Sequence, residues 1–427
     1  MAVLAKNADA LASWLAAVPK GGITAAARAA ACDRLAAMGL PGRRDEYWRY
    51  TDPAGLIARD APADPARDAE PELFTDVNAL RLVFADGVFD AGASDDLSGE
   101  GVEIARLAVA DTAQLHWAQG VYGALESAGH VPVARPLAAL NTALAQDGVL
   151  IRVTGKASRA LHIVYRHTSD TSDAMLHHCI KLMDGAELTL IETGTLGARG
   201  NTVLEADLAP GARLHHVRAQ GRDHDRRLAT HVFARIGAGA LFKSFTFGQD
   251  GRLTRNEAVL DIRGDHAVAH VAGAFLGDGA HSAVLHDDNV FITHDAVACE
   301  SRQVFKKVLK NGATGVFQGK ILVKPGAQKT DGYQISQSLL LDEDSQFLAK
   351  PELEIYADDV KCSHGSTTGA IDDTALFYLR SRGVPRDRAT ALLVLSFLAD
   401  AIAEIEDEAL AGEVVARIGH WLEVDNG

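Results

Sequence analysis

Short apolar runs separated by glycine-containing turns fill the chain from about residue 148 to about residue 365. Val149–Val153, Leu161–Tyr165 and Leu188–Ile191 are typical, and each has the length of a strand rather than of a helix. Similar turn words recur at intervals of 30, 26, 26 and 27 residues. Their glycines are Gly155, Gly185, Gly211, Gly237 and Gly264.

A repeat of this length, built from short strands, indicates a solenoid of stacked coils. One coil cannot bury its apolar face alone, so the next coil must supply the other wall. A right-handed parallel β-helix over residues 148–365 meets this need, and the repeat continues less regularly through Asn311–Ala313 and Pro325–Ala327. An antiparallel sandwich is the alternative, because hairpins also place turns at short intervals.

Both ends of the chain have helical character. Residues 1–147 read as an N-terminal helical region with short strands around Leu80–Phe84 and Val102–Leu107. Residues 366–427 read as a C-terminal helical domain, in which Asp372 and Asp373 can cap a first helix. Pro385 then opens a longer helix, as proline does at a first helical position. The predicted fold is therefore mainly β with helical ends.

The longer C-terminal helix is apolar on more than one side. One stripe follows helical spacing, while Leu393, Val394 and Phe397 lie off it. The stripe comprises Ala391, Leu395, Leu398, Ile402 and Ile405. Such a helix is either buried in a bundle or covered by a partner, and the pattern leaves both readings open.

Composition narrows the classes of protein that fit. The 427 residues carry a formal net charge of −15 and are 47% apolar, which opposes binding to nucleic acid or an anionic membrane and excludes wholesale disorder. The longest apolar run, Ala389–Ala399, is far too short to span a bilayer. The four cysteines are isolated in sequence, at Cys32, Cys179, Cys299 and Cys362. This spacing disfavours a disulfide framework or zinc ribbon and favours the reducing cytoplasm.

Common catalytic and nucleotide-binding motifs are absent from the sequence. Gly315–Gly319 has too few residues between its glycines for a phosphate-binding loop, and Ile321 stands where Ser or Thr is needed. We therefore expect no ATP bound by this chain and no enzyme activity. The adjacent histidines His177-His178 and His215-His216 would point to opposite faces of a strand, so we interpret them as solvated or as satisfied core residues.

Cys362 and His364 form the one pair with metal-binding character that the sequence singles out. Positions two apart on a strand share a face, and a thiolate beside an imidazole suits iron–sulfur or zinc ligation. Two ligands make half a site, so the others would come from elsewhere or from a second chain. The alternative is a buried cysteine beside a capping histidine.

These residues lie in a block with a specific resemblance. Lys350–Gly369 and Leu376–Gly383 closely resemble the SufB/SufD family of the Suf iron–sulfur assembly system. Weaker similarities span nearly the whole chain, at Gly315–Ile321, Gln328–Gln334, Leu140–Gly148 and Arg43–Thr51. Leu379 stands where SufB-type chains typically carry a cysteine, so the resemblance favours the SufD branch.

The resemblance implies a non-catalytic scaffold that contributes to cluster assembly and iron acquisition in a complex with a SufB homologue and the SufC ATPase. A transient Fe-S cluster or iron would be shared with SufB at an interface containing His364 and its neighbour Cys362. The C-terminal helix with Ala391, Leu395, Leu398 and Ile402 would dock the ATPase. The family also suggests an association with reduced flavin, although the sequence contains no flavin motif. The sequence does not fix the oligomeric state of the isolated chain, for which a homodimer that mimics the pairing with SufB is one possibility.

Two other functions remain as alternatives. A SufB-like scaffold could build clusters by itself, although Leu379 argues against it. A β-helix enzyme, such as a polysaccharide lyase or an acyltransferase, would need a ladder of carboxylates or basic residues on one coil face, and none is visible in the sequence.

Overall fold

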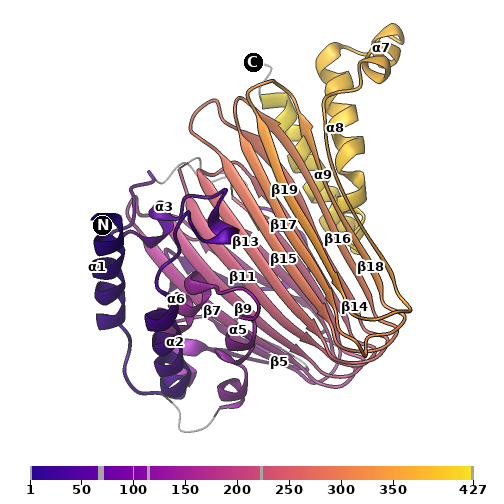
Figure 1. The fold of residues 1–427 in the computed structure, drawn as a ribbon. Coiled ribbons are helices and arrows are strands. Elements are labelled where there is room, and N and C mark those ends of the chain that lie inside the picture. The colour runs from indigo at the N-terminus through magenta and orange to yellow at the C-terminus, as the bar shows by residue number, and fades with distance from the viewer. Residues whose placement is uncertain (1, 66–71, 100, 113–115, 222–224, 425–427) are drawn as a thin grey trace.

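The computed structural model describes residues 2–65, 72–99, 101–112, 116–221 and 225–424 (Figure 1). Within these residues the strands form two ten-stranded sheets, and from residue 149 onward successive strands of the chain alternate between them. Each coil therefore contributes one strand to each sheet, and like strands of neighbouring coils pair in parallel. This is the parallel β-solenoid with helical ends that the turn spacing predicted.

Sheet A contains, in chain order, β1 (Ala79–Ala85), β2 (Val88–Phe89), β6 (Ala160–Arg166), β8 (Glu187–Gly194), β10 (Arg213–Gln220), β12 (Leu241–Gln249), β14 (Val268–Asp278), β16 (Glu300–Lys310), β18 (Asp331–Leu340) and β20 (Lys361–Gly369). Sheet B contains β3 (Ser98–Gly99), β4 (Val102–Arg106), β5 (Val149–Val153), β7 (Asp173–Leu182), β9 (Arg199–Leu208), β11 (Arg227–Ile236), β13 (Leu253–Ile262), β15 (Leu285–His294), β17 (Thr314–Val323) and β19 (Gln346–Ile355). The two expected N-terminal strands, β1 and β4, thus extend the solenoid sheets, while the boundary at residue 147/148 stays a prediction.

The repeating glycines occupy equivalent corners of the solenoid. All five lie where the chain passes from sheet B to sheet A, as does Pro325–Ala327. Gly264 is required by close approach, because a Cβ atom there would lie 1.9 Å from the backbone nitrogen of Ala238 in the preceding coil. Asn311–Ala313 differs from the expected series. It turns the chain from β16 to β17, at the opposite edge.

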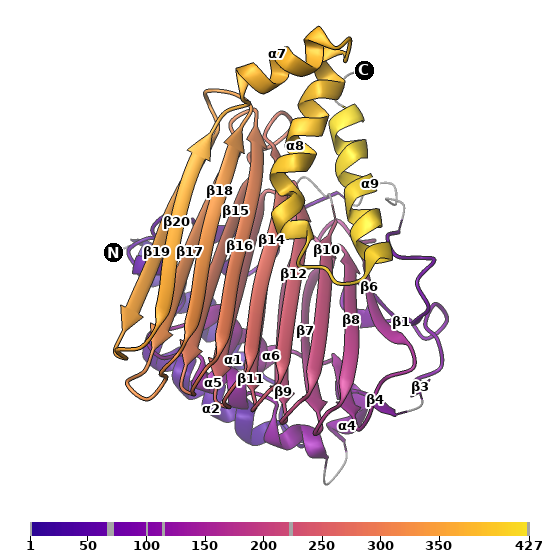
Figure 2. The same ribbon diagram turned by 90° about the vertical axis from the view of Figure 1, so that its right-hand side faces the viewer.

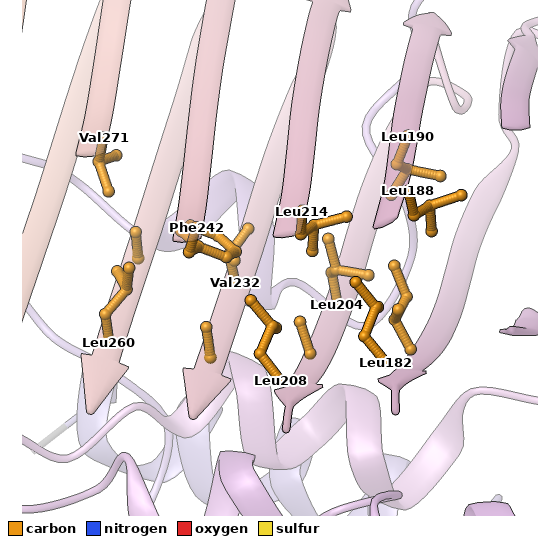
Figure 3. Close-up of a cluster of buried hydrophobic side chains, with 14 of the residues drawn as sticks. Leu182, Leu188, Leu190, Leu204, Leu208, Leu214, Val232, Phe242, Leu260 and Val271 are labelled. Atoms are coloured by element: carbon orange, nitrogen blue, oxygen red, sulfur yellow. The ribbon is translucent and has the colours of Figure 1, made fainter. Parts of the chain in front are cut away.

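The solenoid interior is filled by side chains from alternate positions of both sheets (Figure 3). Leu190 and Leu214 from sheet A face Leu204 and Val232 from sheet B, and all four are almost completely buried. Burying one such side chain contributes roughly 1.5–3 kcal/mol. Further along the solenoid the interior becomes polar, because Asn256 donates to Asp288 and Asp288 pairs with Lys307.

N-terminal helices cover the outer face of sheet B (Figure 1). They are α1 (Ala2–Ala16), α2 (Ala25–Met38), η1 (Glu46–Trp48), α3 (Ala54–Ile57), α4 (Leu107–Ala110), η2 (Trp117–Gly120), α5 (Ala124–Ala128) and α6 (Pro136–Leu144).

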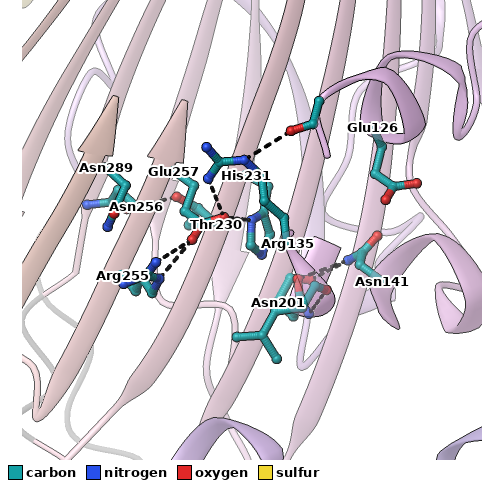
Figure 4. Close-up of polar contacts among 12 residues, drawn as sticks. Glu126, Arg135, Asn141, Asn201, Thr230, His231, Arg255, Asn256, Glu257 and Asn289 are labelled. Atoms are coloured by element: carbon teal, nitrogen blue, oxygen red, sulfur yellow. Dashed lines mark hydrogen bonds and ion pairs between the residues drawn. The ribbon is translucent and has the colours of Figure 1, made fainter. Parts of the chain in front are cut away.

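Buried polar contacts fix this layer to the sheet (Figure 4). Asn141 of α6 donates to the carbonyl oxygen of Asn201 in β9, and Arg135 pairs with Glu257 of β13. Burial alone would raise the pKa of Glu257, but Arg255 and Arg135 outweigh it and hold that pKa well below its usual range. Removing one partner would leave a buried charge uncompensated, so the network specifies how the layers meet.

Three C-terminal helices accompany sheet A (Figure 2). They are α7 (Asp373–Ser381), α8 (Arg386–Ile402) and α9 (Glu408–Val424). Asp372 caps α7 as predicted, because its carboxylate accepts hydrogen bonds from the backbone N–H groups of Thr374 and Ala375. Pro385 lies at the N-cap of α8, one position earlier than predicted.

Candidate functional site at the open end of the solenoid

The last coil is uncovered. β20 pairs with β18 and β19 pairs with β17, and in the described part of the chain no strand pairs with the other edge of either strand. Most residues of β20 are exposed. Two strand edges therefore present unpaired backbone N–H and C=O groups at one end of the molecule, which is a template for pairing with another chain.

The register of β20 determines where His364 points. His364 lies opposite Gln334, which is fully buried and donates to Gln303 at 2.7 Å inside the solenoid. The same face carries Ser366, whose hydroxyl contacts that of Ser336 at 3.0 Å. His364 therefore shares the interior face of the coil, yet it is exposed because no further coil covers it.

Cys362 shares this face but is half-buried. Its side chain packs against the apolar cluster that includes Ile321, Val323 and Ala327. Burial raises the pKa of the Cys362 thiol, so it is protonated at neutral pH. To bind a metal it must lose that proton, and a cation placed beside it would favour the loss.

The end coil thus offers one imidazole and one thiol that face an open surface. In the portion of the chain that the structure describes, the only cluster of three His, Cys, Asp or Glu residues spaced for metal binding lies elsewhere, under the N-terminal helices. If Cys362 and His364 bind a metal, they supply two of its ligands. The remaining ligands would have to come from another molecule.

The apolar stripe of α8 is placed against this chain's own sheet. Ala391, Leu398 and Ile402 are buried and Leu395 is half-buried; Leu395, Leu398 and Ile402 belong to one cluster with side chains of β10, β12, β14 and β16. These side chains hold the helix on sheet A. Other apolar side chains of α7 and α8 face outward: Phe377 is 74% exposed, Tyr378 56% and Leu392 40%.

Carboxylates of the α8–α9 connection fasten the helices to sheet A. His215, Lys243 and His270 lie in register on β10, β12 and β14. Glu406 pairs with His215 at 3.0 Å and with Lys243 at 2.9 Å, and Glu404 pairs with His270 at 2.8 Å. A cavity of about 200 Å³ lies between these groups. Glu404 and Glu406 thus already have partners on sheet A beside this cavity.

The adjacent histidines point to opposite faces of their strands, as predicted. His178 and His216 face the interior, where His216 bonds to Glu192 at 2.7 Å. His177 faces the N-terminal helices beside Cys179 and Glu205. This grouping was not predicted from the sequence. The interval from Cys179 to Glu205 equals the 26-residue interval from Gly185 to Gly211, so aligning the coils on their glycines would have brought the two together.

Two family models match the chain. A model described as "SUF system FeS cluster assembly, SufBD core domain" covers residues 165–397, and "SufBD protein N-terminal region" covers residues 20–160. None of the helices in the described ranges combines the length and apolar character needed to cross a membrane.

Curated relatives agree with these models. The chain is 30% identical to the iron-sulfur cluster assembly protein SufD of Escherichia coli (strain K12), over 91% of each chain. It is 26% identical to an iron-sulfur cluster assembly SufBD family protein of Synechocystis, over 91% of this chain and 88% of the relative. It is also 26% identical to SufD of Bacillus subtilis (strain 168), over 66% of each chain.

Proposed function

Because the chain belongs to the SufBD family of iron–sulfur cluster assembly proteins, we propose that it is a non-catalytic, SufD-type scaffold subunit. In this proposal it pairs with a SufB homologue, shares a transient cluster or iron with it as cargo, and docks a SufC ATPase. The observation that carries the proposal is the uncovered last coil, whose edge strands β19 and β20 expose unpaired backbone groups.

The two unpaired edges favour a partner built in the same way. A homologous open end could continue both sheets at once, because its strands would have the same spacing and would pair antiparallel with β19 and β20 where the two open ends meet. The continuation would cover the interior face that carries Cys362 and His364. Their thiol and imidazole would then meet the ligands of the partner, which supplies the half of the site that this chain lacks.

The exposed apolar side chains of α7 and α8 support ATPase docking. Leu395, Leu398 and Ile402 pack α8 against sheet A, and Ala391 is buried on the same helix, so the proposed part of these four residues is to hold the docking helix in place. Phe377, Tyr378 and Leu392 would form the contact. Exposed aromatic side chains grouped on one element are typical anchors of protein interfaces.

The proposal is tested by the variant His364→Ala, with Ser363→Ala as the matched control. Ser363 is the neighbouring exposed residue on the other face of β20. We expect both variants to fold with unfolding free energies within about 0.5 kcal/mol of the parent. Copurification of the chain with SufB and SufC homologues should succeed, and only His364→Ala should abolish cluster formation by the complex.

Other outcomes would overturn parts of the proposal. Normal cluster formation by the His364→Ala complex would remove His364 from the site. Failure of the parent chain to copurify with a SufB homologue would contradict the proposed interface between the two chains. A stoichiometric cluster on the isolated chain after anaerobic addition of iron and sulfide would favour a self-sufficient scaffold instead.

A further inference from the structure

A second group of metal-ligand side chains lies far along the chain from the end coil, between sheet B and the N-terminal helices. His177 and Cys179 share the outer face of β7, and Glu205 lies directly opposite Cys179 on β9. All three side chains are completely buried. One ligand atom from each lies within 4.8 Å of the other two. An imidazole, a thiol and a carboxyl are thus enclosed together.

Hydrogen bonding fixes the tautomer of His177. The amide nitrogen of Asn141 donates to the carbonyl oxygens of Leu176 at 3.1 Å and Asn201 at 2.9 Å, so Asn141 Oδ1 must face the histidine. That oxygen is 3.1 Å from His177 Nδ1, which therefore carries the proton and donates it. His177 Nε2 is left as a bare acceptor. Histidines that bind metals are oriented by this kind of second hydrogen bond.

Two of the grouped side chains have buried polar atoms without a partner among the described residues. His177 Nε2 accepts no hydrogen bond, and neither does Glu205 Oε2. Leaving a buried acceptor unsatisfied costs about 1–3 kcal/mol. Unpaired buried acceptors are rare in folded proteins, and two at one place indicate a missing donor or cation.

The spacing fits a cation better than a direct hydrogen bond. His177 Nε2 and Glu205 Oε1 are 3.7 Å apart, which is too long for a hydrogen bond between them. Ligand bonds of about 2.0–2.3 Å around a tetrahedral zinc ion separate the ligand atoms by roughly 3.3–3.8 Å. The imidazole and carboxylate already have this separation, and the Cys179 sulfur lies within 4.8 Å of both.

From this geometry we propose that His177, Cys179 and Glu205 bind one divalent transition-metal ion of the zinc or ferrous-iron class. Nitrogen, sulfur and oxygen donors together suit such borderline ions rather than calcium or magnesium. A thiolate and a carboxylate balance the two charges of the ion, so the buried site is neutral overall. The thiol binds as a thiolate, so binding releases its proton.

The metal-free site has a different charge state. Burial raises the pKa of the Cys179 thiol and of the Glu205 carboxyl well above their usual values, and burial lowers the pKa of His177 to about 3. Burial thus disfavours the charged form of each group when no ion is bound. The ring centroid of Tyr122 lies 4.1 Å from that of His177, with the two rings tilted by 32°, and the backbone N–H of Glu126 donates to Glu205, so the site lies beneath α5 and its neighbours. An ion there would tie β7 and β9 together.

The test uses the isolated full-length chain, produced in cells grown with cobalt and purified without a metal-affinity column. Cobalt incorporated during folding avoids the need for entry into a closed site. We expect one cobalt per chain by elemental analysis and a thiolate-to-cobalt charge-transfer absorption in the near ultraviolet. Cys179→Ser should remove the absorption, and His177→Gln should remove the bound metal.

Two matched cysteine variants locate the ion. The first, Cys299→Ser, changes a buried thiol that lies in another coil than Cys179 and hydrogen-bonds to two carbonyl oxygens. The second, Cys362→Ser, changes the thiol at the open end. Both should keep the full absorption. If Cys179→Ser fails to fold, the nearly isosteric Glu205→Gln gives the same test, because it should lower the metal content while circular dichroism stays unchanged.

Several results would overturn this inference: a metal-free parent chain, an absorption that survives Cys179→Ser, or an absorption lost in Cys362→Ser. A chelator should also lower the melting temperature of the parent chain and leave that of Cys179→Ser unchanged. No partner subunit takes part in these measurements, so their failure would leave the proposed scaffold function untouched.

Discussion

At the scale of single residues, the solenoid encloses several histidine rings in neutral form. Burial lowers the pKa of His178 and of His294 to about 4, and that of His286 to about 3. Above pH about 6.5 these rings are neutral in both the folded and the unfolded chain, so they create no pH dependence. Below that pH the unfolded chain binds protons first, and stability falls until the folded rings also titrate near pH 4 or below.

His294 tests this effect because burial is the whole cause of its shift. Its Nε2 atom lies 2.8 Å from the hydroxyl of Ser301 inside the solenoid. We expect the parent chain to lose stability between pH 6.5 and 4, and His294→Gln to lose less by about 1–2 kcal/mol at pH 5. Urea unfolding at pH 7.5 and pH 5 measures the difference. Equal pH dependence in both chains would show that His294 is protonated in the folded state.

At the scale of elements, the glycine corners are the part of the fold that the sequence predicted best. A fixed turn every 26 to 30 residues implies one coil per interval whatever the strand details are, because stacked coils must turn at equivalent places. Gly237 and Gly264 show the reason for the residue type. A Cβ atom at Gly237 would lie 2.8 Å from the carbonyl oxygen of Leu208, and the contact at Gly264 is closer still.

Gly264→Ala should therefore destabilise the chain, and Gly155→Ala should not. A Cβ atom at Gly155 would meet nothing within 4 Å, although this glycine belongs to the same series of corners. Overpacking against backbone costs at least about 1–3 kcal/mol. Urea unfolding followed by circular dichroism would measure this loss for Gly264→Ala and a change within about 0.5 kcal/mol for Gly155→Ala. Similar stabilities of the two variants would mean that the corner at Gly264 relaxes freely.

Contacts between coils were harder to predict than the coils themselves. Cys179 and Glu205 meet because their strands pair with an offset of 26 residues, whereas Glu205 and its next neighbour Phe233 pair with an offset of 28. Such offsets depend on the lengths of the turns that lead from sheet A to sheet B. These turns contain no regular sequence motif from which their lengths could be predicted. The burial of Leu398 was ambiguous for a related reason, since an apolar helix face looks the same whether a sheet or a partner covers it.

At the scale of the whole molecule, the two ends of the solenoid differ. Toward the N-terminus the sheets finish in the two-residue strands β2 and β3, which pair antiparallel with their neighbours. Short terminal strands present little edge to another chain. At the C-terminal end β19 and β20 are ten and nine residues long and uncovered. The sheets can therefore be extended by another chain only at the C-terminal end, which suits one partner at one interface.

The C-terminal helices make a second surface with two distinct sides, and the sides can be separated by mutation. Leu398 is fully buried against sheet A, whereas Phe377 and Leu392 are exposed. Leu398→Ala should lower the unfolding free energy by about 2–5 kcal/mol, because it opens a cavity under α8. The double variant Phe377→Ala with Leu392→Ala should leave that free energy within about 0.5 kcal/mol of the parent.

Binding should show the opposite order. If the outward side of α7 and α8 docks an ATPase subunit, the loss of two apolar anchors should weaken capture of a SufC homologue about tenfold or more. Capture is measured at a temperature where Leu398→Ala is still folded, so that this variant reports the effect of reduced stability alone. Full capture by the double variant would exclude this face. Loss of capture only in Leu398→Ala would show that binding depends on the position of α8 on the sheet rather than on the exposed side chains of α7 and α8.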